Sequence, residues 1–127
     1  MARTVTTRLS GYILLLLALF STIFTPSSVA ERTTLDNFSK CLAEKNAVMY
    51  GAFWCEHCKE QKDLFGSSFR YVRYTECAVK GAPRQQTDIC RNLAIVRYPT
   101  WIFADNERRE GPVSLKALAD KTGCKLP

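Results

Sequence analysis

The feature that most constrains the fold of this chain is a pair of cysteines, Cys55 and Cys58, placed directly after an apolar segment. Residues 47–53 are almost continuously apolar, as expected for a strand buried on both faces of a sheet. Residues 55–65 have the polar pattern of an exposed helix that ends near Gly66. Two thiols at this spacing on the first turn of a helix can close a small disulfide ring. The pattern therefore predicts a strand-to-helix junction that carries two sulfur atoms.

The rest of the chain alternates helical and strand-like segments. The expected elements are a helix over 34–45, a strand over 71–77, a turn over 80–83, a helix that begins at Thr87, a strand over 100–104 and a final helix over 114–123. Strands separated by helices favour parallel pairing of the early strands, and right-handed crossovers place helices on both faces of one sheet. The sequence therefore predicts an α/β domain.

The first 30 residues have the pattern of a secretory signal peptide. Basic Arg3 and Arg8 precede an apolar stretch over 12–24, and small residues at Ser28 and Ala30 suit a signal peptidase. We expect cleavage after Ala30, a single domain over residues 31–127, and an extracytoplasmic location in the periplasm or an equivalent oxidising lumen. The alternative is an uncleaved membrane anchor, for which the apolar stretch is short.

The charges of the chain are scattered rather than clustered. It carries 18 Lys and Arg against 12 Asp and Glu, a net charge of +6, and its only adjacent basic pair is Arg108-Arg109. Nucleic-acid binding needs a basic patch or stripe, so we expect no nucleic-acid partner. We expect a monomer that uses no cofactor.

The surroundings of Cys55 favour thiol–disulfide exchange. A sulfur at the N-terminus of a helix lies near unpaired N–H groups and the positive end of the helix dipole, which stabilise a thiolate. The imidazolium of His57, the single histidine, would add to this effect and make the disulfide a better oxidant. The carboxylate of Glu56 opposes it. The sequence leaves open which of these two charges dominates.

Two other interpretations of Cys55 and Cys58 remain. They could form half of a zinc site, but Cys77 and Cys90 are too far apart in the sequence to form the other half. They could also form a purely structural disulfide, although so short a ring constrains little of the unfolded chain. We therefore expect no metal.

A second motif, Tyr98-Pro99-Thr100, precedes the last long apolar strand. Together with the cysteine pair, this motif resembles the active-site segments of the thioredoxin superfamily. Within it, the chain resembles the thioredoxin-like domains fused to bacterial and plant homologues of vitamin K epoxide reductase, and their free-standing relatives. The matching segments, in order over residues 34–124, are Tyr50-Gly51-Ala52-Phe53-Trp54-Cys55, Cys58-Lys59-Glu60-Gln61-Lys62, Glu76-Cys77, Cys90, Tyr98-Pro99-Thr100-Trp101 and Thr122-Gly123-Cys124.

The resemblance implies a thioredoxin-like fold with a central mixed sheet and helices on both faces. The first strand of a full thioredoxin is expected to be absent, because residues 34–45 already have helical periodicity. It implies that Cys55 attacks and that Cys58 resolves. Pro99 would be cis and would lie against the disulfide, and Trp54 and Tyr98 would lie beside the substrate. The candidate catalytic set is thus Cys55, Cys58, His57 and Pro99.

The sequence departs from the family pattern at two positions that bear on the chemistry. Glu56 stands where the family often has Pro or Gly, which leaves the redox potential open. Met49 stands six residues ahead of Cys55, where many thioredoxins carry a buried acid. That acid is therefore not available to accept a proton from Cys58.

The other four cysteines suit structural disulfides. Cys77 and Cys90 bracket a turn-rich loop, and a bridge between them would restrict the unfolded chain; the alternative is a second redox pair that exchanges with the first. In a thioredoxin topology, Cys41 and Cys124 would lie at the pole away from the active site. There they would either pair or remain free, and pairing is slightly favoured.

The leading hypothesis is an exported thiol–disulfide oxidoreductase that acts on client proteins with thiols or disulfides. In the fused proteins of the subgroup, the domain passes electrons to a quinone-reducing membrane part, so we expect a separate membrane partner of the vitamin K epoxide reductase type. The alternative is a non-catalytic, disulfide-stapled module that binds extended peptides beside Tyr98 and Pro99.

Overall fold

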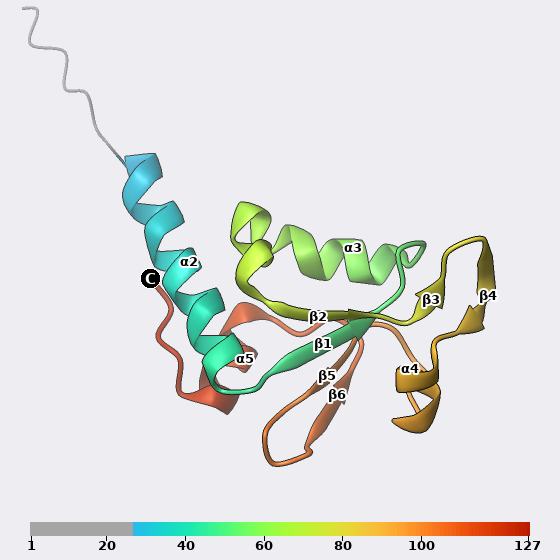
Figure 1. The fold of residues 1–127 in the computed structure, drawn as a ribbon. Helices are drawn as coiled ribbons and strands as arrows, with labels where there is room; N and C mark the ends of the chain where they lie inside the picture. The colour runs from blue at the N-terminus through green and yellow to red at the C-terminus, as the bar shows by residue number, and fades with distance from the viewer. Residues whose placement is uncertain (1–26) are drawn as a thin grey trace, which may run out of the picture.

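The computed structural model describes residues 27–127, so residues 1–26 of the predicted signal peptide lie outside the described part of the chain. The described residues form helices packed around a sheet, with a separate small hairpin (Figure 1). In chain order the elements are α2 (Ser27–Glu44), β1 (Val48–Gly51), α3 (Glu56–Asp63), the 3-10 helix η2 (Gly66–Tyr71), β2 (Arg73–Glu76), β3 (Ala78–Val79), β4 (Ala82–Gln86), α4 (Asp88–Asn92), β5 (Thr100–Ile102), β6 (Arg108–Glu110) and α5 (Leu115–Thr122).

The central sheet has four strands in the order β2-β1-β5-β6. Strand β1 pairs in parallel with β2 and antiparallel with β5, and β5 pairs antiparallel with β6. The predicted α/β class, the parallel early strands and the mixed sheet are confirmed. The predicted helix over residues 34–45 lies largely within α2, the first element of the described part of the chain.

The two faces of the sheet carry separate apolar clusters, because successive side chains of a strand point to opposite faces. Met49 and its register partner Trp101 belong to the larger cluster, which α2, α3 and α5 cover. Tyr50, the next residue of β1, belongs to the smaller cluster beside α4. The buried members of that smaller cluster are Tyr50, Cys77, Cys90 and Ile95.

A buried glutamine fixes α3 against the sheet. The side-chain nitrogen of Gln61 donates to the carbonyl oxygen of Val113 at 3.0 Å. Its oxygen accepts from the backbone N–H of Val113 at 2.6 Å and from the indole N–H of Trp101 at 3.3 Å. All its buried polar atoms are thus paired, which avoids the free-energy cost of an unpaired polar group. The helix that begins at the cysteine pair is held at its second turn.

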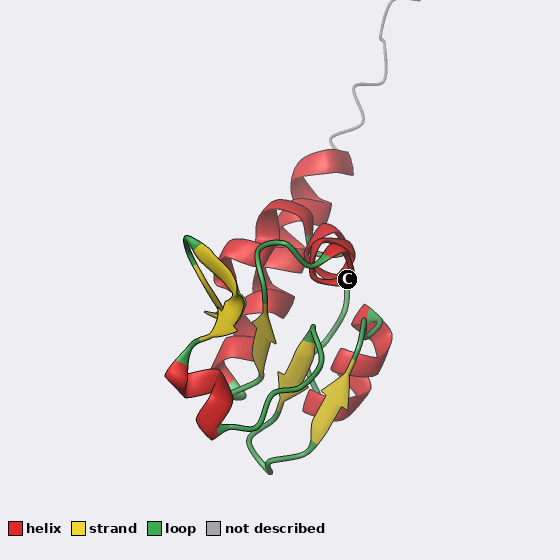
Figure 2. Cartoon of the chain, turned by 90° about the vertical axis from the view of Figure 1, so that its right-hand side faces the viewer, coloured by secondary structure: helices red, strands yellow, loops and turns green. Residues whose placement is uncertain are grey.

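Three segments differ from the sequence-based expectation. Helix α2 begins at Ser27 rather than at Thr34, so the predicted cleavage position falls inside it. Residues 66–71 form a 3-10 helix that begins at Gly66, whose φ is +53°. The predicted turn over 80–83 belongs to a two-stranded hairpin, β3–β4, which stands apart from the main sheet (Figure 2). Pro83 is tolerated there because β4 is an edge strand.

No helix in residues 27–127 combines the length and the apolar character needed to cross a bilayer.

The structure contains two disulfides, one around the hairpin and one between the first helix and the C-terminal segment. Cys77 is bonded to Cys90, 13 positions away, and this bridge closes the segment that contains β3 and β4. Cys41 of α2 is bonded to Cys124, which follows α5, so this bridge joins the first helix to the C-terminal segment. Cys55 and Cys58 are free thiols.

We predict that replacing Cys77 and Cys90 together with Ser lowers the melting temperature markedly. A disulfide that closes a loop of this length stabilises a protein by about 3 kcal/mol in the chain-entropy model. For a domain of this size, that corresponds to a shift of roughly 10 °C or more. Thermal unfolding followed by circular dichroism measures the shift. The matched control is the Cys55→Ser/Cys58→Ser protein. It keeps both disulfides of the structure, so its melting temperature should be close to that of the parent. Equal melting of all three proteins would contradict the structural role.

Candidate active site

The first cysteine of the pair is the N-cap of α3. Cys55 has extended backbone angles, and its Sγ accepts a hydrogen bond from the backbone N–H of Cys58 at 3.3 Å. Its carbonyl oxygen accepts from the N–H groups of Cys58 and Lys59 at 3.1 Å each. The sulfur therefore lies at the positive end of the helix dipole, where negative charge is stabilised. It is half-buried, so a client sulfur can approach it.

The second cysteine lies beneath the helix and is closed to solvent. Cys58 is 1% exposed and belongs to the larger apolar cluster. Burial, followed by the hydrogen bond with Cys55, raises the pKa of Cys58 to about 12. Its thiol is therefore protonated at neutral pH. The two sulfur atoms differ strongly in access, as an attacking and a resolving thiol require.

The predicted proline segment lies directly beside the first cysteine. The Tyr98–Pro99 bond is cis, and Pro99 is fully buried. The Sγ of Cys55 lies 3.7 Å from the carbonyl oxygen of Tyr98, to which it donates. The Oγ1 of Thr100 donates to the carbonyl oxygen of Arg97 at 2.7 Å and so spans the turn that contains Tyr98 and Pro99. Segments more than 40 residues apart in the sequence thus meet at one sulfur atom.

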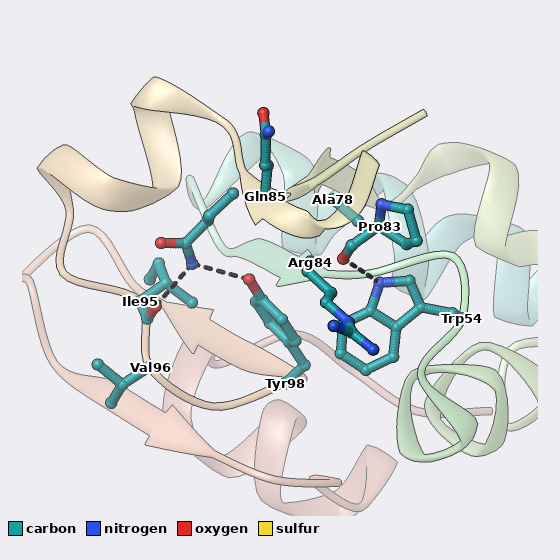
Figure 3. A pocket seen from close by; sticks show the side chains of 9 residues that line it. Trp54, Ala78, Pro83, Arg84, Gln85, Ile95, Val96 and Tyr98 are labelled. Carbon is teal, nitrogen blue, oxygen red and sulfur yellow. Dashed lines mark hydrogen bonds between the residues drawn. The ribbon is translucent and has the colours of Figure 1, made fainter. Parts of the chain in front are cut away.

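A groove lies beside the cysteine pair, between the hairpin and the proline segment (Figure 3). It has a volume of about 570 Å³, and Trp54 and Tyr98 line it with residues of β3, β4 and the segment before Tyr98. The indole N–H of Trp54 donates to the carbonyl oxygen of Pro83 at 3.1 Å. The side-chain nitrogen of Gln86 donates to the hydroxyl oxygen of Tyr98 and to the carbonyl oxygen of Ile95, each at 2.7 Å.

The contribution of the hairpin to this groove was missed by the sequence analysis. Only a turn was expected over 80–83, whereas β4 supplies one wall of the groove. The two cysteines that bracket this segment were a usable signal, because the Cys77–Cys90 bridge holds the hairpin near the proline segment. The predicted binding residues Trp54 and Tyr98 do meet here, with their rings edge to face at 5.9 Å between centroids.

A carboxylate that the sequence analysis did not single out orders the loop before Cys55. The Oε1 of Glu76 accepts from the backbone N–H groups of Phe53 and Ala78, at 3.1 and 2.9 Å. Its Oε2 accepts from the hydroxyl of Tyr74 at 2.8 Å. Glu76 therefore connects the end of β2 to the loop that carries the cysteine pair. The sequence analysis named Glu76 only as part of the matching segment Glu76-Cys77 and assigned it no role.

The histidine between the two cysteines points its ring toward a carboxylate. His57 is 66% exposed, and its Nδ1 lies 3.0 Å from the Oε2 of Glu60, one turn further along α3. Glu60 therefore offsets the positive charge that His57 can supply near the helix N-terminus. Among the described residues, no group of three or more His, Cys, Asp or Glu is arranged to hold a metal ion.

The chain was compared with known proteins in sequence and in structure. No family model matches the chain. Over 91 residues, it is 40% identical to the thiol-disulfide oxidoreductase LTO1 of Arabidopsis thaliana. The chain belongs to the thioredoxin superfamily. The match covers 69% of this thioredoxin-like chain and 24% of LTO1, so the chain spans about a quarter of the length of its curated relative.

One solved structure of the superfamily also aligns with this thioredoxin-like chain. It is the oxidized form of mitochondrial thioredoxin 3 from Saccharomyces cerevisiae, at 20% sequence identity and a TM-score of 0.33. The alignment covers 71% of this chain and 87% of that one. The family assignment rests on the match in sequence, and the sheet order, the cysteine pair at the start of α3 and the cis-proline agree with it.

We predict that Cys55 of the reduced protein reacts with iodoacetamide before Cys58. Cys55 is accessible and lies at a helix N-terminus, whereas Cys58 is buried with a pKa raised to about 12. The thiolate is the reactive form, so the labelling rates near pH 7 should differ by more than about tenfold. Peptide mapping by mass spectrometry measures both rates. Equal or reversed labelling would contradict the assignment of the two sulfur atoms.

We predict that His57→Ala makes the Cys55–Cys58 disulfide less oxidising, whereas Glu60→Gln makes it more oxidising. The first change removes a positive charge near the thiolate, and the second removes the carboxylate that offsets it. A tenfold change in the equilibrium constant of exchange corresponds to about 30 mV. An exposed charge should change that constant by less than tenfold, so we expect each reduction potential to shift on the order of ten millivolts. Equilibration with glutathione buffers measures the potentials. Two unchanged potentials would show that neither charge tunes the site.

Proposed function

We propose that this chain exchanges disulfides with client proteins through Cys55 and Cys58. The observation that carries this proposal is the accessible Cys55 sulfur at the N-terminus of α3, next to a buried second thiol and to the carbonyl of Tyr98. To oxidise a client, a client thiolate attacks Cys55 of the Cys55–Cys58 disulfide, and Cys58 leaves and takes up a proton. A second client thiolate then attacks the client sulfur of the mixed disulfide and releases the Cys55 thiolate. Reduction of a client is the reverse sequence.

The groove beside the cysteine pair is the proposed binding site for the client segment. Trp54 offers an exposed aromatic face at one end of the groove, and Tyr98 carries the carbonyl that touches the Cys55 sulfur. The hydrogen bonds from Trp54 to Pro83 and from Gln86 to Tyr98 hold the walls in place before a client arrives. A wall that is already ordered lowers the entropy lost on binding.

We also propose that the chain acts outside the cytoplasm and exchanges electrons with a membrane protein of the vitamin K epoxide reductase type. Three observations support this proposal. The first 30 residues have a signal-peptide pattern, the two disulfides suit an oxidising compartment, and the sequence resembles domains fused to such membrane proteins. N-terminal sequencing of protein recovered from the exported fraction should begin at Glu31 or within a few residues of it. A chain that still begins at Met1 and stays in membranes would contradict export with cleavage.

We predict that Cys58→Ser accumulates mixed disulfides through Cys55 when the reduced protein meets a peptide or protein disulfide. Without the second thiol, the complex between Cys55 and the client cannot be resolved. Non-reducing electrophoresis and mass spectrometry detect the adducts. The matched control is Cys55→Ser, which keeps the buried thiol and should form none. If the Cys58→Ser protein forms no adduct while the folded parent binds peptides, the domain is a non-catalytic binding module.

A further inference from the structure

One charged side chain lines the groove beside the cysteine pair. Of the nine residues around this groove, Arg84 alone carries a formal charge, and the others have apolar, aromatic or amide side chains. Two of them, Trp54 and Val96, are 54% and 79% exposed and offer apolar surface to a bound segment. Any preference of the groove for one sign of charge therefore depends on Arg84.

The side chain of Arg84 extends from β4 into this groove. The side-chain nitrogen of Gln86 donates to the hydroxyl oxygen of Tyr98, so the face of β4 that carries Gln86 is turned toward the proline segment. Alternate residues of a strand share a face, and Arg84 precedes Gln86 by two positions. Figure 3 shows Arg84 directed toward the rings of Trp54 and Tyr98. The intervening Gln85 points away from them.

No carboxylate in the described part of the chain neutralises the Arg84 side chain. Two other arginines near the groove are engaged, because Arg91 forms an ion pair with Asp88 and Arg97 lies 3.6 Å from Glu110. The Arg84 side chain is exposed, and within residues 27–127 it takes part in no ion pair or side-chain hydrogen bond. Its guanidinium N–H groups are therefore available to a ligand.

Two carboxylates near the cysteine pair do not contribute to the groove. Both oxygens of Glu76 accept hydrogen bonds, one from two backbone N–H groups and the other from the hydroxyl of Tyr74. Glu56 lines a smaller hollow of about 210 Å³ on the α3 side of the cysteine pair, and it does not line this groove. The charge of the groove is thus positive, and it favours an incoming anion.

We propose that Arg84 selects client segments that carry an acidic residue near the reacting cysteine, an inference that rests on the proposed exchange reaction. A client sulfur bonded to Cys55 lies beside the carbonyl of Tyr98, whose oxygen is 3.7 Å from the Cys55 sulfur. The residues that flank the client cysteine then enter the groove that Arg84 lines. A guanidinium can donate two parallel hydrogen bonds to one carboxylate, whereas it repels an ammonium group. Arg84 is thus a specificity-determining residue and takes no part in the sulfur chemistry.

The test measures one bond-forming step with peptides that differ only in charge. All proteins carry Cys58→Ser, are reduced, and are mixed with symmetric peptide disulfides that have aspartate, asparagine or lysine beside the cysteine. The Cys55 thiolate attacks one peptide sulfur, the peptide disulfide breaks, and the other peptide leaves as a thiolate. Mass spectrometry of acid-quenched samples gives the rate at which the mixed disulfide forms. Each rate is divided by that of the asparagine peptide, so an effect on Cys55 itself cancels.

The variant Arg84→Gln supplies the intrinsic reactivity of each peptide. Relative to it, the protein with Arg84 should react about threefold faster with the aspartate peptide and about threefold more slowly with the lysine peptide, the scale of one exposed ion pair. Arg84→Glu should show the opposite preference. Both preferences should fade at roughly 1 M salt, where the screening length is about 3 Å.

A charge elsewhere in the hairpin distinguishes recognition in the groove from long-range attraction. Lys80→Glu changes the net charge as much as Arg84→Glu does, but Lys80 lies between β3 and β4 and does not line the groove. This control should keep the preference for the aspartate peptide. A preference that survives both Arg84 variants, or that Lys80→Glu removes to the same extent, would overturn the inference. If Arg84→Glu does not fold, Arg84→Gln decides alone. If no peptide forms a mixed disulfide through Cys55, the proposed exchange itself is wrong.

Discussion

The geometry of the site depends on the close packing of the first turn of α3 against the end of β1. Gly51 leaves no room for a side chain, because an added Cβ would come within 2.8 Å of the Cys58 sulfur. This packing buries one thiol while it leaves the other at the helix N-terminus. Gln61 holds the next turn of the same helix through three hydrogen bonds. The difference between the two sulfur atoms therefore follows from the backbone arrangement.

The hairpin adds a second constraint on the site. The Cys77–Cys90 bridge closes the segment that contains β3 and β4, and this segment supplies a wall of the groove beside Trp54 and Tyr98. Loss of the bridge should therefore affect client binding as well as stability. Glu76, directly before the bridge, ties the same segment to the loop of the cysteine pair.

Local patterns were enough to predict the alternation of helices and strands and the cysteine junction, whereas the mixed sheet and the cis-proline segment were predicted from the resemblance to the thioredoxin superfamily. The apolar run before Cys55 and the polar helix after it define the junction by themselves. The β3–β4 hairpin could not be predicted in this way, because its residues have weak strand propensity and are held by a disulfide and long-range contacts. The roles of Gln61 and Glu76 depend on partners 23–52 residues away, which no local periodicity reveals.

The most direct test of the central claim is a redox titration of the Cys55–Cys58 pair with both other disulfides intact. Reduced and oxidised forms are separated by alkylation and mass spectrometry after equilibration in thiol–disulfide buffers of known potential. A redox-active pair should titrate as one two-electron couple between about −270 and −120 mV, the range of the thioredoxin-like exchange proteins. A potential below about −300 mV, typical of structural disulfides, would contradict the account.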